Sequence, residues 1–315
     1  MYYGEISPKT NKRSGLGLYV YPSGDVYFGT WLENQLINGT YIFKNGESYE
    51  GSVKNGKQGW GRYRYSNGNV YEGEWKDDIK EGKGTMWYPN QDKYEGLWVK
   101  GKKNGWGKYF YNNATIYDGN FLNGRKHGFG TIAFPNGTKI EANWQQTHVE
   151  GEGKVFYPNG DFFHGEYSMS EKHGKGMYIW ASDNSKYEGE FKKDTLEGEA
   201  KIYFTSNEYF FGRIRNGKRD GQGTYAYENG DSFNGEWKND NKLIGHYKFK
   251  NGDQFEGKFK DNQLNFGVLK YVNGESYEGE FRNGYRHGVG SYRYCNGEIV
   301  CEGHWENDNF ISAGH

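Results

Sequence analysis

Aromatic residues and glycines occupy alternate positions along most of the chain, and charged residues fill the positions between them. The segment YEGEW places Tyr71, Gly73 and Trp75 in one phase and Glu72 and Glu74 in the other. Alternation with a period of two is typical of a β-strand, because successive side chains point to opposite faces of a sheet. The pattern therefore predicts strands with one face of rings and glycines and one charged face.

A second type of segment lies between copies of the first and has two glycines followed by two aromatic residues. One copy, GWGRYRY, places Gly59, Gly61, Tyr63 and Tyr65 on one face. The two segments alternate with a period of roughly 22 to 25 residues, and such self-similarity is the mark of a repeat protein. We expect the in-strand glycines to leave floor space on which the rings of neighbouring strands lie.

Asn-Gly dipeptides link the second segment to the next copy of the first, and this dipeptide is the strongest short signal for a hairpin. A loop made of Asn67 and Gly68 alone would divide the rings between two faces. Adding Asn69 to the loop sets Tyr65 opposite Tyr71 and keeps every ring on one side, so we predict the longer loop. The dipeptides begin at Asn45, Asn67, Asn136, Asn159, Asn229, Asn251, Asn273 and Asn296.

These segments resemble MORN repeats (membrane occupation and recognition nexus), whose unit is close to YxGxWxxGKxHGxG. The copies from Tyr117 to Gly130 and from Tyr277 to Gly290 follow that unit nearly throughout. The resemblance implies an all-β fold, namely an elongated single-layer antiparallel meander of about 14 hairpin repeats, twisted into a trough or rod. We expect residues 1–305 to form one continuous array, capped by its first and last repeats, and residues 306–315 to form a C-terminal tail.

Some repeats depart from this unit. Ala142 and Ala200 replace glycines, and the segments before Gly39, Gly245 and Gly267 lack the usual first glycine. We expect these changes to weaken individual hairpins or to mark bends, without changing the fold.

Composition indicates a folded chain with balanced charge. Only 34% of the residues are hydrophobic, but 19% are aromatic, which is far too many for a disordered chain. The 40 basic and 41 acidic residues give a net charge of -1, which disfavours nucleic acid as a partner. No apolar run approaches the ~20 residues that span a bilayer, and the only cysteines, Cys295 and Cys301, fit a reducing compartment. We therefore expect a soluble intracellular protein.

Candidate catalytic residues recur at the same phase of the repeat, which favours a structural role. His127, His173 and His287 each follow a Lys or Arg and precede a glycine. Glu72, Glu74 and their equivalents face away from the rings, so we expect them to be solvated. The sequence has no zinc-ligand spacing, no phosphate loop that starts a helix, and no nucleophile beside a candidate base. We predict no enzymatic activity, no cofactor and no metal.

Large hydrophobic residues also gather in the outward phase of the middle third. Scattered exposed rings are common, but a cluster on a rigid sheet resembles an interaction hot spot. In the C-terminal repeats we expect this face to be mostly polar, for example at Glu278, Glu280, Ser291 and Arg293. We predict that the middle repeats dock a protein partner or a second copy of the chain. The predicted binding residues are Trp60, Trp87, Trp106, Phe110, Phe129, Phe156 and Phe162, with Val70 and Ile116 in the same phase.

The family suggests three settings: radial spoke heads of motile cilia, scaffolds at membranes or the cell cortex, and accessory modules of enzymes. Because the repeats fill the chain and leave no room for an enzyme domain, we disfavour the third setting. We predict a non-enzymatic scaffold for protein assembly in the ciliary axoneme, such as the radial spoke, with another MORN protein or a second copy among its partners. The alternative is a membrane scaffold that binds phosphoinositides through basic residues near the turns. These residues are Lys100, Lys102, Lys103, Arg125, Lys126, Lys218 and Arg219.

Overall fold

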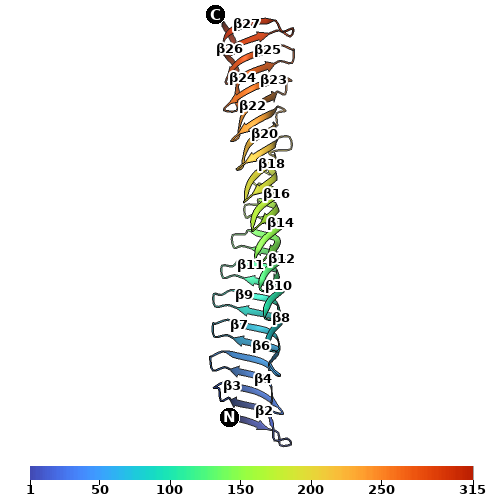
Figure 1. Cartoon of the computed structure of the whole chain (residues 1–315), viewed down its shortest axis with the longest axis vertical. Helices are drawn as coiled ribbons and strands as arrows, with labels where there is room; N and C mark the ends of the chain where they lie inside the picture. Colours follow the sequence, from blue (N-terminus) through green and yellow to red (C-terminus); the bar gives the residue numbers. More distant parts are fainter. Residues whose placement is uncertain (315) are drawn as a thin grey trace. The chain divides into compact units, whose positions relative to one another are not determined.

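The computed structural model describes residues 1–314, which form 28 β-strands and no helix. The chain divides into two compact units, the first from Met1 to Pro158 and the second from Asn159 onward. Within each unit every strand pairs antiparallel with the strands before and after it, so each unit is an open meander (Figure 1). The predicted all-β antiparallel meander is confirmed.

The strands of the first unit are β1 (Tyr2–Ile6), β2 (Arg13–Val20), β3 (Val26–Leu32), β4 (Gln35–Ile42), β5 (Ser48–Val53), β6 (Lys57–Arg64), β7 (Val70–Lys76), β8 (Ile79–Trp87), β9 (Lys93–Val99), β10 (Lys102–Phe110), β11 (Ile116–Leu122), β12 (Arg125–Ala133), β13 (Lys139–Gln145) and β14 (His148–Phe156).

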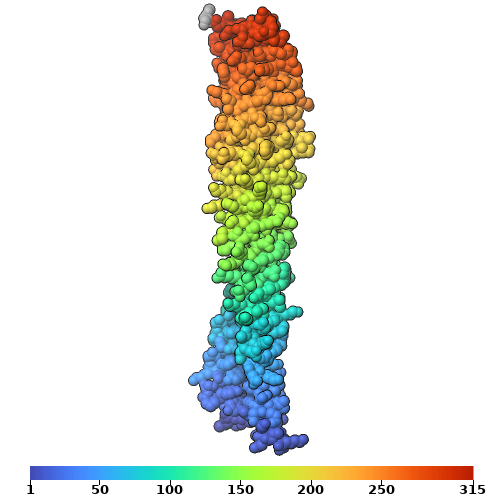
Figure 2. Space-filling view, turned by 45° about the vertical axis from the view of Figure 1, so that its right-hand side comes forward, coloured from blue at the N-terminus to red at the C-terminus, as the bar shows by residue number. Residues whose placement is uncertain are grey.

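The strands of the second unit are β15 (Phe162–Ser168), β16 (Glu171–Ile179), β17 (Lys186–Lys192), β18 (Thr195–Tyr203), β19 (Tyr209–Arg215), β20 (Lys218–Ala226), β21 (Ser232–Lys238), β22 (Asn241–Lys248), β23 (Gln254–Lys260), β24 (Gln263–Lys270), β25 (Ser276–Arg282), β26 (Tyr285–Arg293), β27 (Ile299–Glu306) and β28 (Asn309–Ala313). Strand β28 pairs with β27 and lies inside the segment that we expected to be a tail. Within each unit the colours of Figure 2 follow the sequence in order, as expected where each repeat contacts only its neighbours.

The Asn-Gly hairpins have three-residue loops, but their register differs from the prediction. Tyr65 N–H donates to the carbonyl oxygen of Asn69 at 2.9 Å, and Gly68 N–H donates to the carbonyl oxygen of Tyr65 at 3.0 Å. The loop is therefore 66–68, and Tyr63, not Tyr65, lies opposite Tyr71. The prediction was wrong by two residues, because the left-handed position that ends this loop belongs to Gly68 (φ 84°). A shift of two preserves the face, so the rings still lie on one side.

The hairpins at the opposite edge use tighter, two-residue turns. Asp77 and Asp78, between β7 and β8, both adopt left-handed conformations, with φ values of 48° and 66°. This geometry matches the twist of the flanking strands. The second turn residue contacts the first residue of the strand before the hairpin. Asp78 N–H donates to the carbonyl oxygen of Lys57, the first residue of β6, at 3.2 Å. Residues 21 apart in sequence therefore meet at this edge.

Paired glycines make the floor under the rings, as predicted. Gly61 lies opposite Gly73, and a Cβ atom on Gly61 would come within 2.3 Å of the Tyr49 hydroxyl. Gly59 serves a different purpose, since a Cβ there would meet no atom closer than 3.9 Å. Its φ of 62° lies at a β-bulge, so this glycine is required by the backbone and not by the rings.

The hairpins that depart from the repeat unit keep their strand pairing. Ala142 lies opposite Gly130 on one side and Gly153 on the other, and Ala200 lies opposite Gly189 and Gly212. Gly39, Gly245 and Gly267, which lack a preceding glycine, each pair with a glycine on both neighbouring strands.

Candidate binding surfaces

The ring face, defined as the side of each unit that carries the Tyr and Trp positions, is the core of the protein. Tyr71 is 0% exposed and Trp75 is 5% exposed, and their rings meet edge to face with centroids 5.1 Å apart. Tyr71 Oη donates to the carbonyl oxygen of Glu74 at 3.0 Å, and Trp75 Nε1 donates to that of Gly61 at 3.0 Å. Burial of a ring together with its polar tip makes these positions structural.

Carboxylates in the Asn-Gly loops connect successive repeats at the rim of the ring face. Glu47 accepts a hydrogen bond from Tyr63 Oη at 2.6 Å and another from Ser66 N–H at 3.0 Å. These two bonds, the Tyr63 bond first, lower the pKa of Glu47 to about 2. Asp161 in the second unit makes the same contacts, with Ala181 N–H at 2.8 Å and Tyr178 Oη at 2.7 Å.

A row of basic side chains lies over the rings, which sequence reasoning missed. Lys103 Nζ is 4.6 Å from the ring centroid of Tyr109 and within 6 Å of Tyr88, Tyr94 and Phe121. The signal for this row was the basic residue directly before the histidine position of the MORN unit, as in Lys126-His127 and Arg286-His287. The equivalent cations are Arg13, Lys57, Lys80, Lys103, Lys126, Lys172, Arg219, Lys242 and Arg286.

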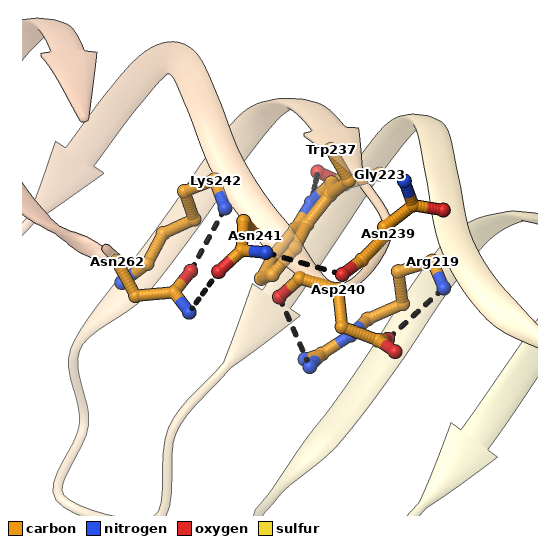
Figure 3. Close-up of polar contacts among 8 residues, drawn as sticks. All are labelled: Arg219, Gly223, Trp237, Asn239, Asp240, Asn241, Lys242 and Asn262. Carbon is orange, nitrogen blue, oxygen red and sulfur yellow. Dashed lines mark hydrogen bonds and ion pairs between the residues drawn. The ribbon is translucent and has the colours of Figure 1, made fainter. Parts of the chain in front are cut away.

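Some of these cations have a carboxylate partner in the two-residue turn at the opposite edge. Arg219 Nε lies 2.9 Å from Asp240 Oδ1, which also accepts the Arg219 backbone N–H at 3.0 Å (Figure 3). Beside them, Trp237 Nε1 donates to the carbonyl oxygen of Gly223 at 3.1 Å (Figure 3). The same pairing joins Lys57 to Asp78 (2.7 Å), Arg286 to Asp308 (3.1 Å) and Lys172 to Asp194 (3.9 Å).

In three consecutive repeats of the first unit the carboxylate partner is missing. The place of the aspartate is taken by Gly101 for Lys80, by Gly124 for Lys103 and by Thr147 for Lys126. The backbone N–H of each of these turn residues donates to the carbonyl oxygen of the corresponding lysine. Burial lowers the pKa of Lys80, and it lowers the pKa of Lys103 and of Lys126 to about 8.

Lys242 in the second unit also lacks a carboxylate at the second position of the two-residue turn, but the chain itself supplies a neutral partner. Its Nζ donates to Tyr227 Oη at 2.9 Å, and its backbone N–H donates to Asn262 Oδ1 at 2.8 Å (Figure 3 shows the second contact). Burial lowers its pKa to about 8 as well.

The placement of the row changes the interpretation of the basic residues near the turns. Lys103, Lys126 and Arg219 lie over rings and do not belong to a basic edge. The other basic residues of that predicted stripe, Lys100, Lys102, Arg125 and Lys218, are exposed.

The outer face, defined as the side opposite to the ring face, carries the predicted binding residues. Trp60 is 56% exposed, and Trp106 and Phe129 are each 49% exposed. Trp87, Ile116 and Phe156 are also exposed, whereas Val70, Phe110 and Phe162 are half-buried. Phe162 belongs to the second unit, and the other residues of the predicted set belong to the first.

The outer patch, defined as Leu97, Trp106, Asn120, Phe129 and Asn143, is a row without charge across β9 to β13. Trp106 lies opposite Asn120, and Phe129 lies opposite Asn143. Asn120 Nδ2 donates to the carbonyl oxygen of Phe129 at 3.3 Å, which joins the two pairs. Leu97 lies beside Gly105, next to Trp106.

The outer face of the second unit is less polar than predicted. Phe211, Ile244, Phe266 and Val289 are exposed there, and Ser291, which lies on this face opposite Glu278, is buried and not solvated. Of the four residues named in the prediction, Glu280 lies in the row of these hydrophobic residues, opposite Phe266, and Glu278 and Ser291 lie in another row, opposite each other. Charges still separate them, because Lys258 lies opposite both Ile244 and Phe266, and Glu280 lies opposite Phe266.

The histidines of the repeat lie apart from one another and from any ligand cluster. His127 and His173 are exposed, and His287 is half-buried. Within residues 1–314 no group of three or more His, Cys, Asp or Glu side chains could hold a metal ion. The same residues contain no helix that is long and apolar enough to span a bilayer.

The fold and the iterated Tyr-Gly-Trp strands define an all-β repeat protein. The family model for the MORN repeat matches residues 11–26, 49–70, 71–93, 94–115, 117–139, 163–185, 187–209, 210–232 and 277–299. Because these segments cover more than half of the sequence, the chain belongs to the MORN repeat family, a family of structural repeats.

Solved structures give only distant likenesses. The SAS-4 (dCPAP) TCP domain of Drosophila melanogaster, in complex with a proline-rich motif of Ana2, is 18% identical over 49% of this chain and 84% of that chain, with a TM-score of 0.32. The TCP10 domain of Danio rerio CPAP, in complex with a STIL peptide, is 11% identical over 97% of this chain and 100% of that chain, with a TM-score of 0.30. These TM-scores are too low to support an inference about function. The comparison with curated proteins gave no match.

Proposed function

We propose that the chain is a non-enzymatic scaffold that docks protein partners through the outer face of its middle repeats, in a ciliary axonemal complex such as the radial spoke. The observation that carries the docking role is the outer patch, where Trp106 and Phe129 are half exposed and the residues between them are uncharged. Exposed Trp and Phe on a rigid sheet bind at a low cost in conformational entropy and dominate interface hot spots.

The rigidity comes from the opposite face of the same strands. Tyr109 on β10 and Ile132 on β12 point to the ring face, where Tyr109 contacts Tyr111 with ring centroids 4.6 Å apart and Ile132 is buried. Trp106 and Phe129 therefore project from strands whose other side is packed. Such a surface is pre-organised for docking and does not need to fold on binding.

The proposed location in the ciliary axoneme rests on resemblance to MORN proteins of radial spoke heads. The alternative, a membrane scaffold, is supported by the exposed basic residues Lys100, Lys102 and Lys218 near the turns. Two observations weigh against it: the net charge of -1, and the placement of Lys103, Lys126 and Arg219 over rings.

Replacing Trp60, Trp106 and Phe129 together by Ser tests the docking role. The variant should keep a melting midpoint close to wild type, because these rings are exposed, and should lose incorporation into the native complex. The matched control replaces Phe211, Ile244 and Phe266 by Ser, which removes three exposed hydrophobic side chains from the second unit. Normal incorporation of the first variant, or equal loss in both, would remove the patch from the proposal.

The proposed axonemal location is tested separately by identifying the proteins that co-purify with the tagged chain from cells with and without motile cilia. Recovery of spoke or other axonemal components from ciliated cells is the expected result. Recovery in a floated lipid fraction, without axonemal components, would favour the membrane scaffold instead.

A further inference from the structure

The three lysines without a carboxylate partner lie at equivalent positions of consecutive repeats on the ring face of the first unit. Lys80 Nζ is 4.6 Å from the ring centroid of Trp98, Lys103 Nζ is 4.6 Å from that of Tyr109, and Lys126 Nζ is 4.7 Å from those of Tyr117 and Trp144. Other repeats place an aspartate at the turn that would neutralise them. These three lysines therefore lack the negative charge that a turn aspartate places beside the equivalent cation in other repeats.

The amino groups of this row remain available to a ligand. In the part of the chain that the structure describes, the enclosed side-chain atoms without a hydrogen bond are Thr115 Oγ1, Asp118 Oδ1 and His287 Nδ1, and none of the three ammonium groups is among them. Each ammonium group therefore keeps some contact with solvent, although Lys126 as a whole is only 8% exposed. Lys126 also lines an open hollow with Arg125, His127 and Gln146, among other residues.

The spacing of the row selects the conformation of a ligand that runs across the strands. The lysines lie on every second strand, β8, β10 and β12, and strands are about 4.8 Å apart, so the repeat distance is about 9.6 Å before twist. A polyproline II segment brings a side chain back to the same side every third residue, or about 9.3 Å. A β-strand does not match, because its side chains return to one face at about 6.7 Å intervals.

We propose that the ring face of β8 to β13 binds an acidic polyproline II segment of a partner protein, with one acidic side chain at every third residue for Lys80, Lys103 and Lys126. Carboxylates are the complementary charge, and each gains a charge-assisted hydrogen bond from an ammonium group that otherwise has no acceptor. The aromatic rings between the lysines provide the kind of surface on which polyproline II segments dock. This site is separate from the outer patch and does not depend on it.

The electrostatics of the row agree with this role. Burial, together with the charge of Lys103, lowers the pKa of Lys126 to about 8, while Asp92 partly offsets the effect of burial on Lys103. The tyrosines that face the three ammonium groups have raised pKa values where a shift is resolved, so they stay neutral below pH 8. Affinity for the acidic segment should therefore fall as the pH rises through about 8, because Lys103 and Lys126 lose their charge.

A short fluorescent peptide of repeated Glu-Pro-Pro triplets is the probe, and fluorescence anisotropy with the full chain is the measurement. The peptide should bind, while a Gln-Pro-Pro peptide and a peptide of the same composition with its glutamates in one block should bind roughly tenfold more weakly. Equal binding of the spaced and blocked peptides would overturn the proposal, because it would show charge attraction without register. Failure of the spaced peptide to bind, or preferential binding of vesicles that contain phosphoinositides, would overturn it as well.

Two variants of the chain locate the site. Replacing Lys80, Lys103 and Lys126 by Met keeps the aliphatic contact with the rings and should weaken binding of the spaced peptide roughly tenfold or more. The matched control replaces Lys76, Lys83 and Lys102 by Met, which makes the same change in net charge at exposed positions and should leave binding unchanged. An equal loss in both triple variants would refute the assignment.

A gain of carboxylates tests the same site without removing any contact between a lysine and a ring. Gly101→Asp, Gly124→Asp and Thr147→Asp together supply the partner that Asp78 and Asp240 supply elsewhere, and Asp78 and Asp240 hold φ values of 66° and 69° at this same turn position. A Cβ on Gly124 meets nothing within 4 Å, and one on Gly101 meets only Ile79 at 3.9 Å. The variant keeps every lysine, so unchanged binding of the spaced peptide would refute the role of the free ammonium groups.

Discussion

Strands β10 and β20 carry the same repeat and differ on both of their faces. β10 reads KKNGWGKYF and β20 reads KRDGQGTYA, and each pairs with a glycine of the following strand at its second glycine. On the ring face, Lys103 has no carboxylate partner in the two-residue turn, whereas Arg219 is paired with Asp240. On the outer face, the exposed Trp106 of β10 corresponds to Gln222 of β20. The glycines and rings that build the sheet are common to both, so the differences fall at positions that the fold leaves free.

This comparison indicates where function resides in such a chain. A repeat protein is stabilised by contacts between neighbouring repeats, and these contacts are made by the recurring residues. Positions that vary from repeat to repeat are therefore the ones that recognition uses. β10 varies on both faces in a direction that favours binding, with a free cation on one side and an exposed ring on the other.

The largest effects on stability should come from the buried rings that both units share. Trp75→Ala in the first unit and Trp237→Ala in the second should each lower the free energy of unfolding by about 3 kcal/mol or more, because each removes a buried ring. Glu72→Ala on the outer face should be nearly silent. Denaturant unfolding of each variant gives the comparison, and equal shifts for Trp75→Ala and Glu72→Ala would mean that the faces are assigned wrongly.

Acid should destabilise both regions through their tyrosine-bound carboxylates. Bonds from Tyr63 and Ser66 lower the pKa of Glu47 in the first unit to about 2, and bonds from Ala181 and Tyr178 lower the pKa of Asp161 in the second. A carboxyl group whose pKa is lower in the folded state contributes stability above its unfolded pKa, and this contribution is lost as the pH falls through the folded value. The melting midpoint should therefore drop between about pH 5 and pH 2. A midpoint that stays constant over this range would contradict the assigned hydrogen bonds.

The ion pair of β20 should have a smaller effect. Asp240→Gly removes the contacts of Asp240 Oδ1 with the guanidinium and backbone N–H of Arg219, and should cost about 1 to 2 kcal/mol. The same position in the β10 repeat already holds Gly124, so the change converts one repeat to the other. Thermal or denaturant unfolding measures the difference, and no loss of stability would mean that solvent screens this ion pair fully.

The smallest effect on stability should come from Trp106→Gln, which gives β10 the outward residue of β20. Because the Trp106 side chain is about half exposed, the free energy of unfolding should change by no more than about 0.5 kcal/mol. Denaturant unfolding provides the check. A loss comparable to that of Trp75→Ala would show that Trp106 belongs to the packed core.

The sequence by itself determined the fold class and the division between the two faces. A side-chain period of two assigns each residue to a face, and Asn-Gly dipeptides at a fixed period connect the strands, so Tyr71, Gly73 and Trp75 could be placed on the ring face without coordinates. It also placed Trp60, Trp106 and Phe129 outward. These inferences depend on neighbouring residues and on whether the register is odd or even. The predicted loop at Asn67 was displaced by one residue, which shifted the strand register by two and left each residue on its predicted face.

Only the tertiary structure decided which residues 21 positions apart meet. Whether a basic residue near a turn points to solvent or lies over rings, and whether an aspartate neutralises it, depends on how three strands align at one edge of the sheet. Lys103 and Arg219 read alike in the sequence, yet the first faces Gly124 and the second faces Asp240. The odd or even position of a residue assigns its face but not this contact. The contact depends on the exact register of the strands and on the left-handed turn that carries the partner.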